Sequence, residues 1–519
     1  MRRLAVVLLI GALVLTPHLS AQDPQTPTFR AGTTLIDFTI VARDSQGNPI
    51  ADLTKDDLVV TENGQPRAIE FFRFDGAPPQ PSPNALPQGH FTNRFETAPN
   101  AARHITAILV DAMNMPTVKD TFQFTQATVR TQILAYLDGL PPHTRVGLFR
   151  LGREVIDVLR DFTDDVAALR AQVAKMELVM PELPGVAGFR DPNFGAASGA
   201  WGSREQAEAR AMALAADAKG TAMYNATVQT KRVDLTLPGL EALGNHLARF
   251  PGRKNIVWVG NGMPLYLGSS RTNFTTNYEP RMRQTAERLA TQGIAVYPVA
   301  SRLASESVKD SLNLFADTTG GRVTLTLNDP TEGLKTTALD QRAIYSLGFY
   351  AVAAPDNKWH PIAVQVRRSN VTVTHRRGYL AEAAAVQPLE WGEEQWRTAL
   401  ANPLSSSVVR LDGQIAPAAG AAPRTFDFRM QIALDDVHFR EIAGKAVGEI
   451  EIVTAEKVAS GDFSFRVERA SLGRTNTDPG ALAPYAQRWT LKPETRTVRV
   501  IVRDRFTGRY GTLDIPIGR

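Results

Sequence analysis

The sequence of 519 residues contains no cysteine. Disulfide bonds, cysteine-bound zinc and a cysteine nucleophile are therefore excluded, and each domain must be stabilised by its own core. The eight histidines are scattered, and none has a metal-binding spacing such as HExxH. The sequence also lacks a GxSxG nucleophile motif and a glycine-rich loop ending in Lys-Ser or Lys-Thr. These common catalytic motifs are thus absent.

A strong charge bias is also missing. The 58 Lys and Arg residues are interspersed with 53 Asp and Glu, so the net charge is only +5. Nucleic-acid binding is therefore not expected, despite a basic isoelectric point. A hydrophobic content of 43% is that of a folded globular protein, and the length predicts about three domains.

The first residues have the order of a secretory signal. Two arginines precede an apolar run from Leu4 to Leu15, and a small residue, Ala21, follows. About 12 apolar residues are few for a bilayer span, although an uncleaved anchor is the alternative. We predict a signal peptide at residues 1–21 and a secreted, periplasmic or cell-envelope protein. No other stretch is apolar enough to span a membrane, so the protein is not expected to be an integral membrane protein after signal removal.

Residues 30–76 predict a small all-β unit. One strand alternates, and its apolar face comprises Ile36, Phe38, Ile40 and Ala42. Asn63-Gly64 between two strand-like runs predicts a hairpin. Residues 77–102 are rich in proline and polar residues without periodicity, which predicts a linker.

Residues 103–340 alternate between apolar strands and amphipathic helices. Examples of the strands are ITAILV, RVGLFRL, NIVWVG and IAVYPV. This alternation predicts a doubly wound α/β domain with a mostly parallel sheet covered on both faces. Residues 178–228 form a long insertion, interpreted as a mobile flap whose alanine-rich part is one helix, separate from a helix around LPGLEALGNHL.

The remaining segments predict β structure. Residues 341–382 contain three strands, which we expect to pack on residues 30–76, so that the α/β domain is inserted into one sandwich. Residues 385–519 contain several alternating runs, such as FDFRMQIAL and TVRVIVRD, and predict a C-terminal β-sandwich.

Several motifs follow one another over roughly residues 30–382, namely ILVDAMNMPT, RVGLFRLG, DFTDD, RVDLTLPGLEAL, PGRKNIVWVGNGMP, IAVYPV, ADTTGGR, YSLGFY and HRRGYL. Their order resembles that in the von Willebrand factor A-related proteins of the acidobacterial type. The resemblance implies a von Willebrand factor A-type domain. It also implies a position for Mg²⁺ or Mn²⁺ at the strand ends, where Asp-x-Ser-x-Ser, a later Thr and a later Asp supply oxygen ligands.

Most of those ligands are replaced in this sequence. Asp111 matches the first aspartate, but Met113 and Met115 stand at the two serine positions, and thioethers do not replace hydroxyls around Mg²⁺. Asn114 is an off-pattern oxygen donor. Asn261 stands for the later aspartate, and Thr236 is the candidate for the loop threonine. We therefore predict a degenerate metal-ion-dependent adhesion site without a resident cofactor. Its residues are then expected to cap loops. The alternative is that Asp111, Asn114 and Asn261 still bind Mg²⁺ or Mn²⁺.

Met113 and Met115 have two interpretations. They form an apolar, adaptable contact for a partner, or they pack inward on the next helix. The sequence leaves both open.

Charged pairs elsewhere are interpreted structurally. Asp164-Asp165 and Asp435-Asp436 are expected to be caps or turn residues. Arg253 and Lys254 in PGRKN either bind an anion or solvate a turn, the second being the default. Arg376 and Arg377 in HRRGYL are expected on a solvated strand edge.

These observations favour an exported, non-enzymatic binding or adhesion-type protein. The A-type domain would contact a protein or extracellular-matrix partner whose identity the sequence does not give. The alternatives are a cell-envelope hydrolase, or a scaffold, with a site outside the A-type loop.

Overall fold

The computed structural model describes fourteen stretches of the chain. They are residues 34–75, 88–94, 104–114, 119–140, 144–152, 155–177, 204–248, 250, 252–269, 274–301, 304–326, 338–352, 355–474 and 480–517. The predicted signal peptide lies outside the described residues. Among the described residues, no helix has the length and apolarity needed to cross a membrane.

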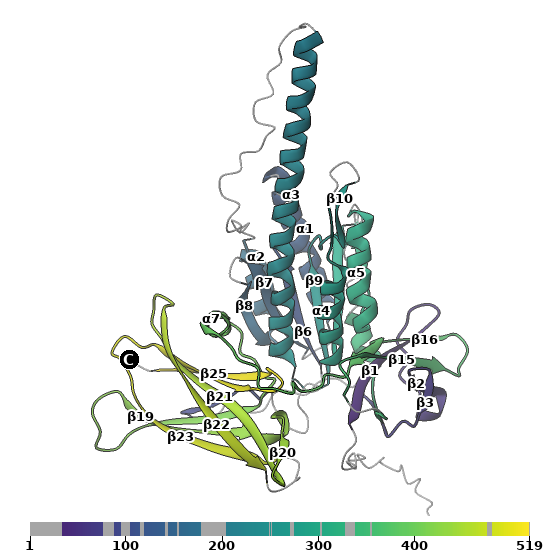
Figure 1. Cartoon of the computed structure of the whole chain (residues 1–519). Helices are drawn as coiled ribbons and strands as arrows, with labels where there is room; N and C mark the ends of the chain where they lie inside the picture. Colours follow the sequence, from purple (N-terminus) through teal and green to yellow (C-terminus); the bar gives the residue numbers. More distant parts are fainter. Residues whose placement is uncertain are drawn as a thin grey trace, which may run out of the picture.

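A six-stranded sheet forms the centre of the molecule (Figure 1). Its strands, in spatial order, are β13 (Thr324–Thr326), β12 (Ile294–Ser301), β9 (Arg253–Val259), β6 (His104–Asp111), β7 (Arg145–Gly152) and β8 (Val155–Thr163). All neighbours are parallel except β7 and β8. The carboxyl ends of the parallel strands therefore meet at one edge, where Asp111 ends β6.

Helices cover both faces of this sheet, because both faces are apolar. One face is covered by α1 (Lys119–Asp138) and α2 (Val166–Lys175). The other is covered by α3 (Arg204–Leu247), α4 (Glu279–Thr291) and α5 (Glu306–Thr319). A small hairpin of β10 (Tyr266–Ser269) and β11 (Phe274–Asn277) stands beside α3. Asp165 caps α2 by accepting a hydrogen bond from the Ala168 N–H at 2.9 Å, as predicted.

Helix α3 corrects the predicted division of the insertion. The alanine-rich segment and the LPGLEALGNHL segment form one helix of 44 residues that runs through Pro238. A continuous buried stripe accounts for this, since it repeats every three or four residues on both sides of the proline. Its members are Val233, Leu237, Leu240, Leu243 and Leu247. Residues 178–203 lie outside the described part of the chain.

Strands from both sides of the α/β domain share a second unit. One sheet has the order β16 (Val371–His375), β1 (Leu35–Asp44), β14 (Ile344–Tyr350), β4 (Phe71–Phe74). The other has the order β17 (Gly378–Leu380), β15 (Trp359–Val366), β2 (Leu58–Glu62), β3 (Gln65–Arg67). The chain after residue 340 thus supplies four strands rather than three. The predicted apolar face of β1 lies in the core between these sheets.

The turn between β2 and β3 has the geometry that its sequence predicts. Asn63 and Gly64 have φ values of 51° and 76°, and Glu62 pairs with Gln65. Positive φ at both central residues is what a two-residue hairpin of this type requires.

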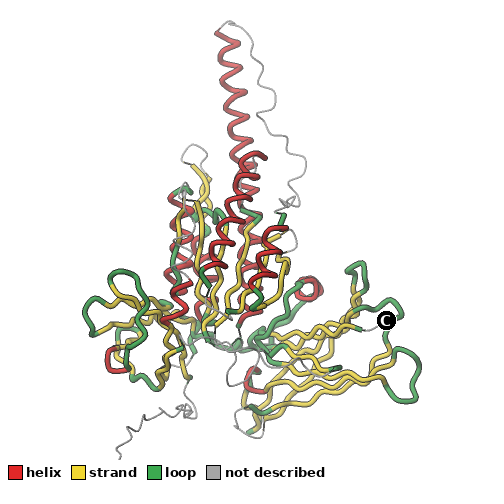
Figure 2. The backbone as a smooth tube through the Cα atoms, turned by 180° about the vertical axis from the view of Figure 1, so that it is seen from behind, coloured by secondary structure: helices red, strands yellow, loops and turns green. Residues whose placement is uncertain are grey.

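The third unit holds two antiparallel sheets (Figure 2). The first consists of β23 (Leu482–Thr490), β19 (Thr425–Ala433), β18 (Leu411–Pro417) and β5 (His90–Thr92). The second consists of β20 (Arg440–Ile442), β21 (Lys445–Lys457), β24 (Thr497–Asp504) and β25 (Tyr510–Pro516), with β22 (Phe463–Arg474) also paired to β21. Helix α7 (Glu393–Ala401), which the sequence analysis missed, packs Trp396 and Leu400 on this second sheet.

Strand β5 shows that the segment predicted as a linker is partly structural. Thr92 pairs with Asp412, and the buried Asn93 donates to the carbonyls of Ser406 and Val409 at 2.9 and 2.8 Å. A strand of three residues is too short to show alternation in the sequence. The C-terminal unit is therefore discontinuous, because residues 88–94 complete it.

Candidate functional site

Asp111 is fully buried at the carboxyl end of β6. Its Oδ1 accepts hydrogen bonds from the backbone N–H groups of Met113 and Asn114, both at 3.1 Å. Its Oδ2 accepts from Asn114 Nδ2 at 2.7 Å and from Trp258 Nε1 at 3.0 Å. Both carboxylate oxygens are thus held by two donors each.

The structure brings three of the four metal-site candidates together. Asn114 Nδ2 also donates to the Oγ1 of the buried Thr236 in α3 at 3.1 Å, so this amide joins Asp111 to Thr236. Asn261 follows Gly260, where a Cβ atom would come within 2.7 Å of the Asp111 Cβ. The Asn261 side chain, however, takes part in none of these hydrogen bonds.

Trp258 is the member of this cluster that the sequence analysis missed. It lies on β9, directly beside β6, where it pairs with Leu109. The signal in the sequence is the indole itself, because a tryptophan inside a continuous apolar strand needs an acceptor for its N–H. The nearest available acceptor at a neighbouring strand end is Asp111.

Burial raises the pKa of Asp111 above its ordinary value, and the hydrogen bonds from Asn114 and Trp258 partly offset this rise. The positive charge of Arg232 lowers the pKa less than these hydrogen bonds do, and among the described residues the groups that donate to the carboxylate are all uncharged. The carboxylate is therefore satisfied by neutral N–H donors.

These residues do not fit Mg²⁺ or Mn²⁺. A carboxylate has about four lone-pair positions, and those of Asp111 face four N–H groups. The Asn114 amide presents its NH₂ group, rather than its oxygen, to Asp111 and Thr236, because two oxygens would otherwise face each other. Its Oδ1 is buried, has no hydrogen-bond partner among the described residues, and is a single ligand at best. Elsewhere in the described stretches, no group of three His, Asp or Glu side chains could hold a metal ion.

Met113 is only 2% exposed and packs in the core under α3 and α4. The prediction that it contacts a partner is therefore wrong, and the core-packing alternative holds. The backbone turn that Asp111 fixes directs this side chain inward. Met115 lies outside the described residues.

At the opposite end of the sheet, three basic residues are buried that were expected in solvent. Arg253, Lys254 and Arg376 are 3%, 6% and 6% exposed. Arg376 donates to the backbone oxygens of Ala290 and Asp37 at 2.7 and 2.8 Å, so the predicted solvated edge is wrong at this position. Arg377 is exposed, as expected. The sequence could not show that other units cover this end of the sheet.

Comparisons with known proteins give limited information. No family model matches the chain, and no curated protein matches it. Among solved structures, a von Willebrand factor type A protein from Catenulispora acidiphila is 9% identical over 94% of this chain and 74% of that one, with a TM-score of 0.27. The human COPII-coat protein Sec24c is 10% identical over 54% and 44%, with a TM-score of 0.24. At these TM-scores neither likeness argues for a function.

Proposed function

We propose that this chain is an exported, non-enzymatic binding protein of the von Willebrand factor A-related type. Its α/β domain would contact a protein or matrix partner through the carboxyl end of the sheet, at a metal-ion-dependent adhesion site that has lost its metal. Export rests on the signal-like residues 1–21.

The geometry of α3 carries the proposal. At about 1.5 Å per residue, a helix of 44 residues is about 66 Å long, whereas the eight residues of β6 span about 26 Å. The part of α3 from Ala226 onward contributes to the core. Its N-terminal part therefore extends beyond the sheet, at the same end as Asp111 (Figure 1). A helix that projects this far is available to a partner.

A second feature at this end supports binding. Tyr266 on β10 is 46% exposed and donates a hydrogen bond to Glu279 at 2.8 Å. Tyrosine is enriched in protein interfaces, because it combines a large apolar ring with a polar tip. The braced Asp111 turn gives these elements a rigid base.

The test uses the mature full chain as bait in envelope extract, followed by affinity measurement with each captured protein after purification. We expect a partner whose binding is lost when residues 182–222 are replaced by a flexible Gly-Ser linker. Tyr266→Ala should weaken the same binding by about tenfold, the effect of one interface aromatic worth about 1.4 kcal/mol.

Val467→Ala is the matched control, because Val467 is a similarly exposed apolar residue, at 40%, on β22 of the C-terminal unit. The proposal is wrong if the linker variant and Tyr266→Ala bind every captured protein as tightly as the unchanged chain does.

A further inference from the structure

A cavity of about 770 Å³ lies where the three units meet, at the end of the sheet opposite Asp111. Residues of β1 line it from the N-terminal β unit, the starts of β9 and β12 line it from the α/β domain, and Arg509 and Tyr510 line it from the C-terminal unit. Its size is in the range of small-molecule sites, about 300–1,000 Å³.

The side chains around this cavity are predominantly basic. Six lining residues are cationic, namely Arg73, Arg253, Lys254, Arg288, Arg376 and Arg509, and three are acidic, namely Asp37, Glu241 and Glu382. Two of the acids are already paired, Glu241 with Arg288 at 3.2 Å and Glu382 with Arg509 at 2.9 Å. Arg73 is also paired, with Asp75 at 2.6 Å, so the excess of positive charge comes from Arg253, Lys254 and Arg376 against Asp37.

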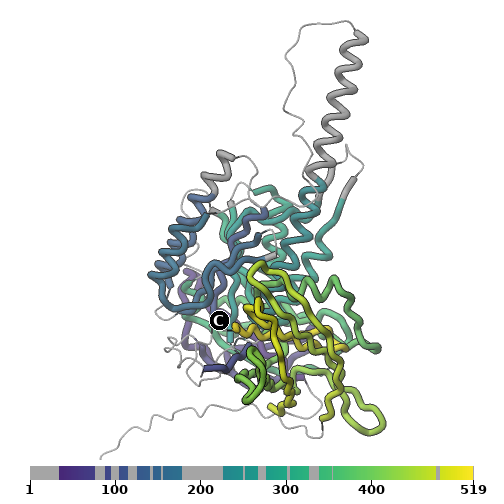
Figure 3. Tube along the Cα trace, turned by 90° about the vertical axis from the view of Figure 1, so that its left-hand side faces the viewer, coloured from purple at the N-terminus to yellow at the C-terminus, as the bar shows by residue number. Residues whose placement is uncertain are grey.

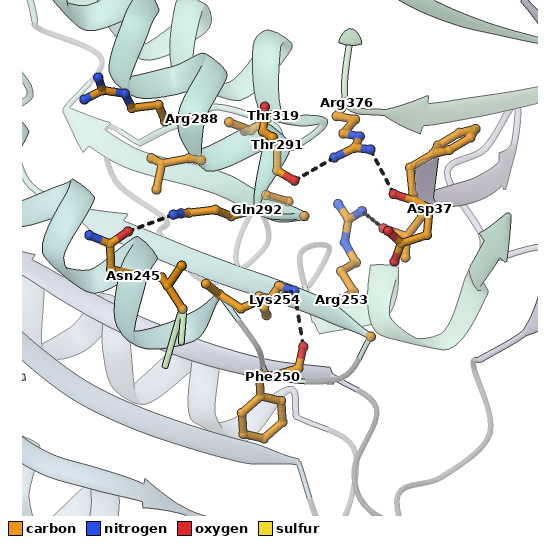
Figure 4. A pocket seen from close by; sticks show the side chains of 18 of the residues that line it. Asp37, Asn245, Phe250, Arg253, Lys254, Arg288, Thr291, Gln292, Thr319 and Arg376 are labelled. Carbon is orange, nitrogen blue, oxygen red and sulfur yellow. Dashed lines mark hydrogen bonds between the residues drawn. The ribbon is translucent and has the colours of Figure 1, made fainter. Parts of the chain in front are cut away.

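The two most buried guanidinium groups of the cavity lining are held by neutral oxygens. Arg253 donates to the side chains of Asn255, Thr39 and Tyr297 and to the Gly320 carbonyl, at 2.8 to 3.1 Å. Arg376 donates to the carbonyls of Ala290, Thr291 and Asp37, at 2.7 to 3.1 Å. Figure 4 shows both groups converging on the segment around Asp37 from two sides. Neither forms an ion pair with a carboxylate of the described residues.

These hydrogen bonds leave donors unused. A guanidinium has five N–H donors, and the bonds above use four of Arg253 and three of Arg376. The Nε of Arg376 is buried and has no hydrogen-bond partner in the part of the chain that the structure describes. Desolvation also lowers the pKa of Arg376, and Asp37 only partly offsets this. Buried charges of this kind are costly unless an opposite charge compensates them.

We propose that this cavity binds a small multivalent oxyanion, such as a phosphate group or a polycarboxylate, between Arg253, Arg376 and Lys254. Guanidinium groups present forked N–H donors that match such oxygens. Because all three units line the cavity, the bound anion also fastens them together. This site is independent of the partner-binding end proposed above.

The test is calorimetric titration of the full chain with inorganic phosphate and, separately, with citrate, each at constant ionic strength. We expect saturable binding of at least one of them, and the tighter of the two identifies the ligand class. Chloride at the same ionic strength should not compete.

Two variants on α4 make the test specific. Arg288→Gln removes a lining charge and releases the carboxylate of Glu241 toward the cavity, so it should weaken anion binding about fivefold. Arg281→Gln is the matched control, because Arg281 is 49% exposed, pairs with Asp234 and does not line the cavity. Lys254→Gln, which removes a buried cation, should weaken binding more than Arg288→Gln.

The proposal is overturned if neither anion gives saturable heat at concentrations up to about 50 mM, well above the millimolar range of weak specific sites. It is also overturned if Arg281→Gln and Arg288→Gln weaken binding equally. If Lys254→Gln does not fold, the comparison of anion binding between Arg288→Gln and Arg281→Gln still tests the proposal.

Discussion

The two ends of the central sheet hold buried charge of opposite sign. At the carboxyl end, the anionic Asp111 receives four N–H donors and has no oxygen lone pair to offer. At the amino end, the cationic Arg253 and Arg376 meet neutral oxygens that use only part of their donors. Figure 3 shows the C-terminal unit, in green to yellow, at the lower end of the α/β domain, and Figure 1 shows α3 extending from the opposite, carboxyl end. A buried charged group whose hydrogen bonds are all made has a structural role, whereas one with unused donors can still bind a ligand.

The largest expected effect is from Asp111→Ala. This change leaves the N–H groups of Met113, Asn114 and Trp258 buried without an acceptor, so we expect a loss of about 3–5 kcal/mol in the free energy of unfolding. Urea denaturation followed by tryptophan fluorescence measures it. Asp165→Ala, which removes an exposed helix cap, should cost only about 1 kcal/mol. Equal losses in the two variants would contradict the structural role of Asp111.

Arg376→Gln should have the next largest effect. It removes a side chain that joins α4 to β1 through three carbonyls, and we expect a loss of about 2 kcal/mol. The exposed neighbour Arg377 supplies the control, since Arg377→Gln should change stability by less than about 0.5 kcal/mol. Thermal unfolding by circular dichroism compares them. An unchanged thermal midpoint for Arg376→Gln would mean that the hydrogen bonds of Arg376 do not stabilise the amino end of the sheet.

His375, beside Arg376, makes the amino end sensitive to acid. Its Nε2 accepts from the Val364 N–H at 3.3 Å and its Nδ1 lies 2.7 Å from the Arg376 carbonyl, an arrangement that suits the neutral ring. Burial lowers the pKa of His375 in the folded state below the ordinary histidine value of about 6.5. The unfolded chain therefore takes up the proton first, so stability is constant well above pH 6.5 and falls below it.

The loss from this group is at most about 1.4 kcal/mol per pH unit. Thermal midpoints measured from pH 7.5 to 5 should fall less steeply for His375→Asn than for the unchanged protein. Identical slopes for the two proteins would contradict the contribution of His375.

The smallest expected effect is that of divalent cations. The donors around Asp111 leave no room for a metal ion. We therefore expect about 5 mM Mg²⁺ or Mn²⁺, which is enough to occupy weak extracellular sites, to shift the thermal midpoint by less than about 1 °C. A saturable shift that disappears in Asp111→Asn would restore the metal site and remove the contrast between the two ends.

Much of the fold could be predicted from the sequence where periodicity is strong. The strands of the parallel sheet, the Asn63-Gly64 hairpin and the Asp165 cap are local features, encoded by residues within one or two turns. The length of α3 could not be predicted, because Pro238 indicates the boundary of a helix. Packing of the buried stripe on the sheet keeps the helix continuous past this proline. Strand β5 was missed because its partner lies more than 300 residues away.

The site was predicted in part. The position of Asp111 at a strand end led to Asn114 and Thr236, which the structure joins to it by hydrogen bonds. The contribution of Trp258 and the burial of Arg253 depend on which strands and units lie side by side. Those contacts arise between segments distant in sequence, so local patterns could not reveal them.

The pairing of β1 has a consequence for how the chain is made. Ile36 pairs with Phe349, 313 positions later. At about 5–20 residues per second, β1 must wait roughly 15–60 seconds for its partners to be synthesised. During that interval both edges of β1 lack their pairing strands, β14 and β16, although its apolar face can already pack on Leu58 and Val60 of β2. Until then, a chaperone would have to keep the open edges of this strand from pairing with other chains.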